Sequence, residues 1–192
     1  MTTADALFEP VRIGGLALPN RVVMAPMTRS FCGDAGLPGP DVARYYAARA
    51  AAGTGLIFTE GTVVDMGPAR GYQGVPGLCN DAQEAAWRRV VDAVHAAGGR
   101  IMVQLWHCGR LAHPRATGGA QPLAPSAIPA AGVYVDAADP STFDGHLSYV
   151  LPKAMDDADI ATVTAAFAAA AGRARRAGFD GVLFHGASGY LI

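Results

Sequence analysis

Three segments of the chain repeat one pattern of apolar and polar positions. Each is an alanine-rich amphipathic run that ends at a glycine and leads into a short apolar stretch. Amphipathic runs are typical of helices that bury one face, and short continuous apolar stretches are typical of strands covered on both faces. The pattern predicts helices at 41–53, 81–99 and 159–178, followed by strands at 56–59, 101–105 and 182–184.

The ends of these helices carry signals of their own. Each run closes at a glycine (Gly53, Gly98 and Gly178), the residue that most easily takes the left-handed conformation ending a helix. Asp81 and Glu84 have the spacing of a capping box at the start of the second helix. In the third helix, apolar residues at spacings of three and four predict one buried face, made of Ile160, Val163, Phe167, Ala170 and Ala174.

The order of the elements predicts an α/β fold. Residues 21–26 supply a further strand before the first helix, so strands and helices alternate along the chain. Strand–helix–strand crossovers produce a parallel sheet. Ahead of this region, residues 11–18 hold a Gly-Gly pair between two short alternating runs and predict a hairpin. After the third strand, residues 109–156 are rich in Pro and Gly and predict a long irregular loop of functional importance.

Composition narrows the range of functions. The chain of 192 residues is 51% hydrophobic and 16% charged, with a net charge of −1, which favours a packed globular core without a surface for nucleic acid. No apolar stretch approaches the roughly 20 residues of a membrane helix, and the first residues do not resemble a secretory signal. Three cysteines without CxxC spacing argue against a disulfide framework or a zinc site. We therefore expect a soluble cytoplasmic protein with no bound metal.

Polar residues collect where three predicted strands end. Residues 25–28 follow the first strand, residues 104–107 end the third, and residues 185–190 follow the fourth. The carboxyl ends of parallel strands are where barrel and open-sheet enzymes build their active sites. The sequence therefore predicts that these three segments share one site.

Together with these segments, five motifs resemble the old yellow enzyme family of FMN-dependent ene-reductases: NRVVMAPMTRS, YYAARA, TEGTVV, GYQGVPG and AGFDGV. The resemblance runs from about Glu9 to the last residue. It implies an incomplete TIM (β/α)8 barrel, made of its first four strands, the hairpin and the long loop after the third strand. Residues 1–192 would then be the N-terminal portion of a single FMN-binding domain whose C-terminal half is absent.

The resemblance also implies roles for individual residues. Thr28 matches the hydroxyl that hydrogen-bonds flavin O4, and Gln104 matches the amide facing the pyrimidine edge. Gly61 matches a close approach of the backbone to the cofactor. The implied FMN contacts are Pro26, Met27, Thr28, Gly61, Gln104 and His185.

For catalysis, the resemblance implies that His185 holds the substrate carbonyl oxygen and Tyr190 donates a proton to the α-carbon. The implied substrate contacts are His185, Ser188, Tyr72 and Trp106. Ser188 stands where the family usually has Asn or His, so we expect weaker or shifted activation of the substrate carbonyl. The implied reaction is reduction of the C=C bond of a small α,β-unsaturated carbonyl compound, with NAD(P)H as reductant.

The sequence is compatible with several alternatives for the nature of the chain and for its function. A complete barrel has about 250 residues, so the chain is expected to be a fragment of a longer protein, a truncated product, or a half barrel that pairs with a second copy as a homo-oligomer. An inactive half-barrel remnant without flavin is the alternative function. A serine hydrolase is disfavoured, because Tyr190 stands where the G-x-S-x-G motif around Ser188 needs a glycine. Taken singly, His185, Gln104, Thr28 and Tyr190 each have an ordinary structural explanation, and only their combination indicates a site.

Overall fold

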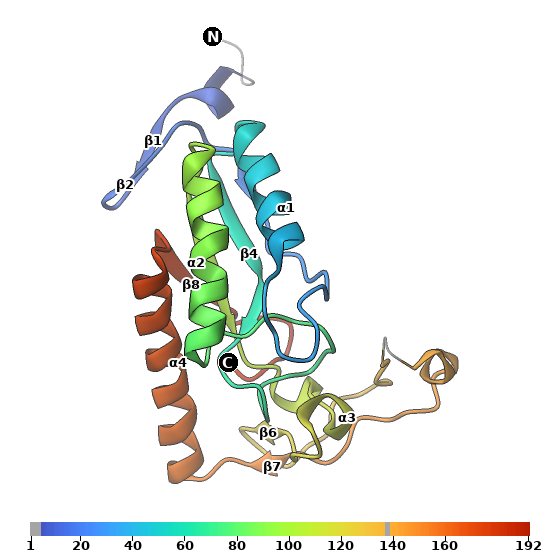
Figure 1. Cartoon of the computed structure of the whole chain (residues 1–192). Coiled ribbons are helices and arrows are strands. Elements are labelled where there is room, and N and C mark those ends of the chain that lie inside the picture. The colour runs from blue at the N-terminus through green and yellow to red at the C-terminus, as the bar shows by residue number, and fades with distance from the viewer. Residues whose placement is uncertain (1–4, 137–138) are drawn as a thin grey trace.

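The computed structural model describes residues 5–136 and 139–192, and a four-stranded parallel sheet lies at its centre (Figure 1). In spatial order the strands are β3 (Val23–Met24), β4 (Leu56–Val63), β5 (Ile101–Trp106) and β8 (Gly181–Phe184). They alternate along the chain with α1 (Pro40–Ala51), α2 (Asp81–Ala96) and α4 (Asp157–Ala177). All three helices lie on the same face of the sheet (Figure 1). The predicted alternation and the parallel sheet are confirmed.

The sheet does not close into a barrel. β3 and β8 are its two edges, and each is hydrogen-bonded to a strand on one side only. The structure is therefore an incomplete α/β fold with its helices on one face of the sheet, consistent with part of a TIM barrel.

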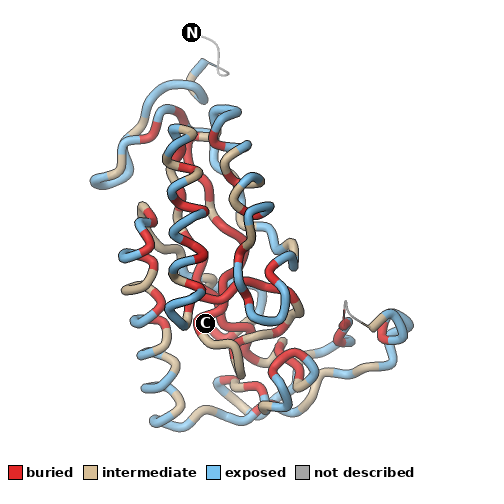
Figure 2. Tube along the Cα trace, viewed as in Figure 1, coloured by how far each residue is buried: buried red, intermediate tan, exposed pale blue. Residues whose placement is uncertain are grey.

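The expectation that every strand is covered on both faces is wrong for the edge strands. β4 is buried almost throughout, but Phe184 in β8 is 52% exposed and Val23 in β3 is 45% exposed. An edge strand lacks a neighbour on one side, so helix packing alone covers only part of it. Burial is therefore greatest in β4 and β5 and between these strands and the helices (Figure 2).

The helix ends follow the predicted chemistry with one correction. Gly53, Gly98 and Gly178 all have left-handed φ angles, of 91°, 81° and 93°. The prediction of a capping box at Asp81 and Glu84 is wrong, because Asp81 is already the first helical residue of α2 and not its N-cap. Asn80 is its N-cap, and its side chain accepts a hydrogen bond from the Gln83 N–H at 2.9 Å.

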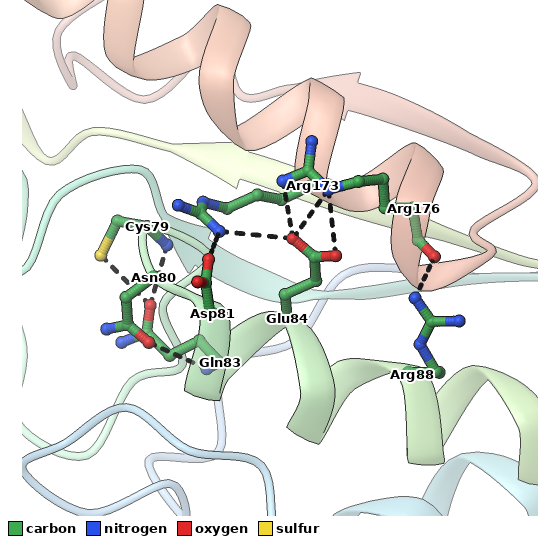
Figure 3. Close-up of polar contacts among 8 residues, drawn as sticks. All are labelled: Cys79, Asn80, Asp81, Gln83, Glu84, Arg88, Arg173 and Arg176. Atoms are coloured by element: carbon green, nitrogen blue, oxygen red, sulfur yellow. Dashed lines mark hydrogen bonds and ion pairs between the residues drawn. The ribbon is translucent and has the colours of Figure 1, made fainter.

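Asp81 and Glu84 instead join α2 to α4 (Figure 3). Arg173 Nη1 lies 2.5 Å from Asp81 Oδ1 and 3.3 Å from Glu84 Oε2. Arg176 Nη2 lies 2.7 Å from Glu84 Oε2. A true capping box starts α4, where Asp156 and Asp159 exchange hydrogen bonds between side chain and backbone.

The predicted apolar face of α4 is buried only along its C-terminal half. Phe167, Ala170 and Ala174 are buried against the sheet and α2, as expected. Val163 is half-buried, and Ile160 is 49% exposed (Figure 2). The N-terminal end of α4 extends past the end of the central sheet, so the sheet does not cover it (Figure 1).

The remaining elements lie before β3 and between β5 and α4. The predicted hairpin is confirmed: β1 (Val11–Ile13) pairs antiparallel with β2 (Leu16–Leu18), and Gly14 in its turn has a φ of +58°. A 3-10 helix (Asp5–Phe8) precedes it. The long loop after β5 holds short elements: 3-10 helices Gly109–Leu111 and Pro140–Asp144, α3 (Pro114–Thr117), and β6 (Leu123–Ala124) paired parallel with β7 (Lys153–Ala154).

None of the helices in the described ranges has both the length and the apolar character that a membrane crossing requires.

Candidate active site

The carboxyl ends of β4, β5 and β8 meet at one edge of the sheet. Gly61 of β4 is the register partner of Gln104 of β5, and Val63 is the partner of Trp106. His185 directly follows β8, and its backbone N–H continues the ladder by donating to the Leu105 carbonyl at 3.0 Å. Three segments far apart in the sequence are thereby brought together.

Trp106 is the centre of an aromatic cluster at this edge. Its indole stacks with Tyr72 (ring centroids 5.5 Å apart) and with His185 (5.9 Å), and Tyr190 meets it edge-on at 4.9 Å. The rings of His185 and Tyr190 are 4.8 Å apart. Trp106 itself is only 2% exposed. It therefore forms the buried support of the cluster, and its predicted contact with substrate stays a prediction.

Gly61 is required by this cluster. A Cβ atom at Gly61 would lie 2.8 Å from Cδ2 of Trp106, which is too close for any real contact. The resemblance to the family implies a close approach of the cofactor at this glycine. The structure supplies a reason within the protein, because the Trp106 ring occupies the space that a side chain would need.

The chemical groups of the cluster are in their neutral forms at neutral pH. Burial lowers the pKa of His185 below its usual value, so its imidazole is neutral. Burial raises the pKa of both Tyr72 and Tyr190, so both phenols keep their protons. The two hydroxyl oxygens lie 3.1 Å apart, within hydrogen-bond distance. The edge thus offers neutral N–H and O–H donors.

Gln104 brings a buried amide to the same edge. The residue is 8% exposed, and its backbone N–H donates to Thr59 Oγ1 at 3.1 Å. Within the described residues its side-chain amide makes no hydrogen bond. An amide carries both donors and an acceptor, so this group can serve a ligand that presents one of each.

The segment after β3 reaches the site through a buried ion pair. Pro26 is half-buried, whereas Thr28 is exposed and Met27 is 51% exposed. The next residue, Arg29, donates its backbone N–H to Glu60 at 3.0 Å and places Nη2 2.7 Å from the same carboxylate. Since Glu60 precedes Gly61, this pair holds the Pro26–Thr28 segment beside the end of β4.

This ion pair was not predicted from the sequence. Glu60 is completely buried, and the hydroxyl of Tyr46 in α1 accepts its backbone N–H at 2.8 Å. A signal was available, because a carboxylate within an otherwise buried strand needs a cationic or hydrogen-bonding partner.

Ser188 stands apart from the other predicted residues. It is exposed, and its backbone is left-handed, with a φ of +63°. Asn adopts this conformation more readily than Ser. Within the described residues the Ser188 side chain makes no hydrogen bond.

Comparison with known proteins identifies the family of the chain. Residues 6–192 match the model of the NADH:flavin oxidoreductase / NADH oxidase family. The chain belongs to this family. It is 43% identical to flavin oxidoreductase hxnT of Emericella nidulans, over all of this chain and 48% of that protein. It is 40% identical to 12-oxophytodienoate reductase 7 of Oryza sativa subsp. japonica, over 97% of this chain and 46% of that protein.

A solved structure extends the comparison to the fold. Morphinone reductase in complex with tetrahydroNAD superimposes with a TM-score of 0.84 and 42% identity, over 97% of this chain and 50% of that one. The resemblance to the old yellow enzymes is thereby confirmed. The chain spans about half the length of the curated relatives it matches.

Proposed function

We propose that the protein works as an FMN-dependent NAD(P)H oxidoreductase that reduces the C=C bond of small α,β-unsaturated carbonyl compounds. The observation that carries the proposal is the convergence of His185 and Tyr190 on Trp106 beside Gly61 and Gln104. Family membership supports a flavin oxidoreductase, and a nicotinamide reductant agrees with the tetrahydroNAD complex of a similar structure. We further propose that residues 1–192 belong to a single FMN-binding barrel domain.

The residues present fit a flavin. The Gln104 amide has unused donor and acceptor capacity, and Thr28 presents an exposed hydroxyl at the neighbouring strand end. We assign cofactor contacts to Pro26, Met27, Thr28, Gly61, Gln104 and His185. When bound and reduced, FMN supplies the hydride for the β-carbon of the substrate.

The chain's own groups do the rest of the chemistry. The neutral imidazole of His185 donates a hydrogen bond to the substrate carbonyl oxygen, which stabilises the negative charge that develops there. Ser188 is the second candidate donor, although its short side chain belongs to an exposed loop. Tyr190 gives its hydroxyl proton to the α-carbon, and its raised pKa keeps that proton in place at neutral pH. Tyr72 borders the same space.

The alternative function is a half barrel without bound flavin. The open sheet edges and the exposed apolar residues Val23 and Phe184 favour it. The absorbance spectrum of the purified protein distinguishes the two, because bound FMN absorbs in the visible range. A colourless protein that gains no visible absorbance on titration with FMN would support the half barrel without bound flavin.

The test of the proposal is Tyr190→Phe, assayed in two half-reactions. Reduction of the flavin by NAD(P)H should keep its rate, because that step needs no proton from Tyr190. Reoxidation by 2-cyclohexenone should slow by roughly two orders of magnitude or more, the usual contribution of a general acid. Anaerobic stopped-flow absorbance measures both rates.

Tyr149→Phe is the matched control. Tyr149 is a partly buried tyrosine of the long loop that contacts Tyr134, with ring centroids 6.1 Å apart. The Tyr149→Phe variant should keep the rates of both flavin reduction and reoxidation by the enone. An enone rate in Tyr190→Phe equal to that of the unmodified protein would rule out the donor role.

A further inference from the structure

Tyr72 and Tyr190 contact each other, and both rings pack on Trp106. Their hydroxyl oxygens lie 3.1 Å apart although the residues are 118 positions apart in the sequence. Tyr72 stacks on Trp106, with ring planes 20° apart, and Tyr190 meets the same ring at 88°. Both phenols therefore pack against the same buried indole, which orients their hydroxyls toward each other.

The backbone fixes the spacing as well. A Cβ atom at Gly71 would lie 2.7 Å from Cβ of Cys108, so the chain before Tyr72 packs directly on Cys108. A Cβ atom at Gly109 would lie 2.8 Å from the backbone nitrogen of Leu191, the residue after Tyr190. The two tyrosines are thus anchored on adjacent residues of the turn that follows β5.

We infer that Tyr72 is a positioning residue, which donates its hydroxyl hydrogen bond to the Tyr190 oxygen and stabilises the phenolate that Tyr190 becomes after giving up its proton. The inference rests on the proposed role of Tyr190 as proton donor. It assigns to Tyr72 a task beyond lining the substrate space.

The direction of the hydrogen bond follows from the chemistry. When the Tyr190 proton points toward a substrate, only the Tyr72 proton can occupy the contact between the two oxygens. On transfer, the O–H bond of Tyr190 breaks, a C–H bond forms at the substrate α-carbon, and the bonding electron pair stays on the Tyr190 oxygen. A hydrogen bond to a charged oxygen is roughly twice as strong as one to a neutral oxygen. Tyr72 therefore favours the product of the transfer, and water then returns a proton to Tyr190.

Burial is the largest influence on the pKa of Tyr190, and the hydrogen bond with Tyr72 is the next. Among the described residues, the titratable groups near Tyr190 are Tyr72, Cys108, Tyr149 and His185. Burial raises the pKa of the Cys108 thiol and lowers that of His185, so both are neutral near neutral pH. The hydrogen bond from Tyr72 counteracts the rise that burial causes in the pKa of Tyr190, and it raises the pKa of Tyr72.

The experiment is a pH titration of the flavin-free protein labelled with ¹³C at the tyrosine ζ-carbons, followed by NMR. Single Phe variants assign the resonances of the six tyrosines. In Tyr72→Phe the midpoint of Tyr190 should rise by about one pH unit, because the phenolate loses a charge-assisted hydrogen bond. In Tyr190→Phe the midpoint of Tyr72 should fall, because Tyr72 no longer donates to a neighbour. Tyr149→Phe should move the Tyr190 midpoint by well under one unit.

An unchanged or lower Tyr190 midpoint in Tyr72→Phe would overturn the inference. A Tyr72 midpoint that stays or rises in Tyr190→Phe would overturn the donor assignment in the same way. The titration needs neither flavin nor substrate, so its failure leaves the proposed reaction standing. Failure of the proposed reaction appears instead in the half-reaction rates of Tyr190→Phe. The titration measures none of these rates.

Discussion

The carboxylate of Glu60 shows how one residue joins a predicted cofactor segment to the sheet. It is fully buried, receives the backbone N–H and guanidinium of Arg29, and lies between the Thr28 segment and Gly61. The Arg29 guanidinium also covers the Tyr45 ring, 3.7 Å from its centroid. A buried charge is tolerated only when partners surround it in this way.

We expect Glu60→Gln to lower the free energy of unfolding by about 3 kcal/mol, because the amide leaves the largely buried Arg29 without its counter-ion. Urea denaturation measures the change. Glu9→Gln, at an exposed acidic residue, is the control and should change stability by less than about 0.5 kcal/mol. Equal effects of the two variants would contradict the structural importance of the buried pair.

Ser188 stands at a position where the resemblance to the family implies Asn or His. Its left-handed backbone suits Asn, and Asn has a longer side chain with an N–H donor. Ser188→Asn should bind phenolic ligands, which mimic the enolate, several-fold more tightly in the flavin-loaded protein, as calorimetry would show. Ser30→Asn is a matched control, since Ser30 is exposed and also left-handed, with a φ of +58°. An equal rise in affinity in both variants would show that the tighter binding does not come from an Asn side chain at position 188.

Between elements, the contact of α2 with α4 depends on charge as well as on apolar packing. Arg176 and Arg173 hydrogen-bond Glu84 and lower its pKa below the usual value (Figure 3). A lowered carboxylate pKa means that the folded state binds protons less readily than the unfolded state. The stabilisation is therefore present above the ordinary pKa of Glu and is lost as pH falls through the folded value.

Glu84→Gln should lower the free energy of unfolding by about 0.5–1 kcal/mol near neutral pH, since partly exposed ion pairs contribute modestly. The difference from the unmodified protein should shrink as pH falls through and below the ordinary Glu range. Urea denaturation across this pH range measures it. Asp92→Asn, at an exposed position of the same helix, should show no such dependence. A difference that persists at low pH would contradict the ion-pair explanation.

At the scale of the whole molecule, the open sheet divides the protein into a stable centre and weaker edges. β4 and β5 are paired on both sides and buried, whereas Val23 of β3 and Phe184 of β8 are about half exposed. Regions with few buried contacts open at low free-energy cost.

Backbone amides of β4 and β5 should therefore exchange with solvent deuterium most slowly, and those of β3 and β8 markedly faster. Hydrogen exchange followed by NMR or mass spectrometry measures this order on the chain described. The hairpin residues Val11–Ile13, which are largely exposed, supply a fast-exchanging reference. Protection of β8 equal to that of β5 would show that its open edge is covered in solution.

The local pattern of the sequence was enough to predict much of the fold. Alternating amphipathic and apolar runs predicted the parallel sheet, and three glycines predicted the helix ends. The capping residue of α2 was placed one position late, because Asp81 and Glu84 also have the spacing of a capping box. Ile160 was expected to be buried, since helical periodicity shows which face is apolar but not whether another element reaches it.

For the candidate site, the sequence by itself determined which chemical groups are present and the strand ends on which they lie. Only the tertiary structure decided how they meet: that Trp106 supports the cluster, that Glu60 binds Arg29, and that Tyr72 reaches Tyr190. The physical reason is that periodicity and turn signals are local, whereas these contacts join residues about 30 to 120 positions apart. Their geometry depends on strand register and on close backbone packing at Gly61, Gly71 and Gly109, which no local pattern encodes.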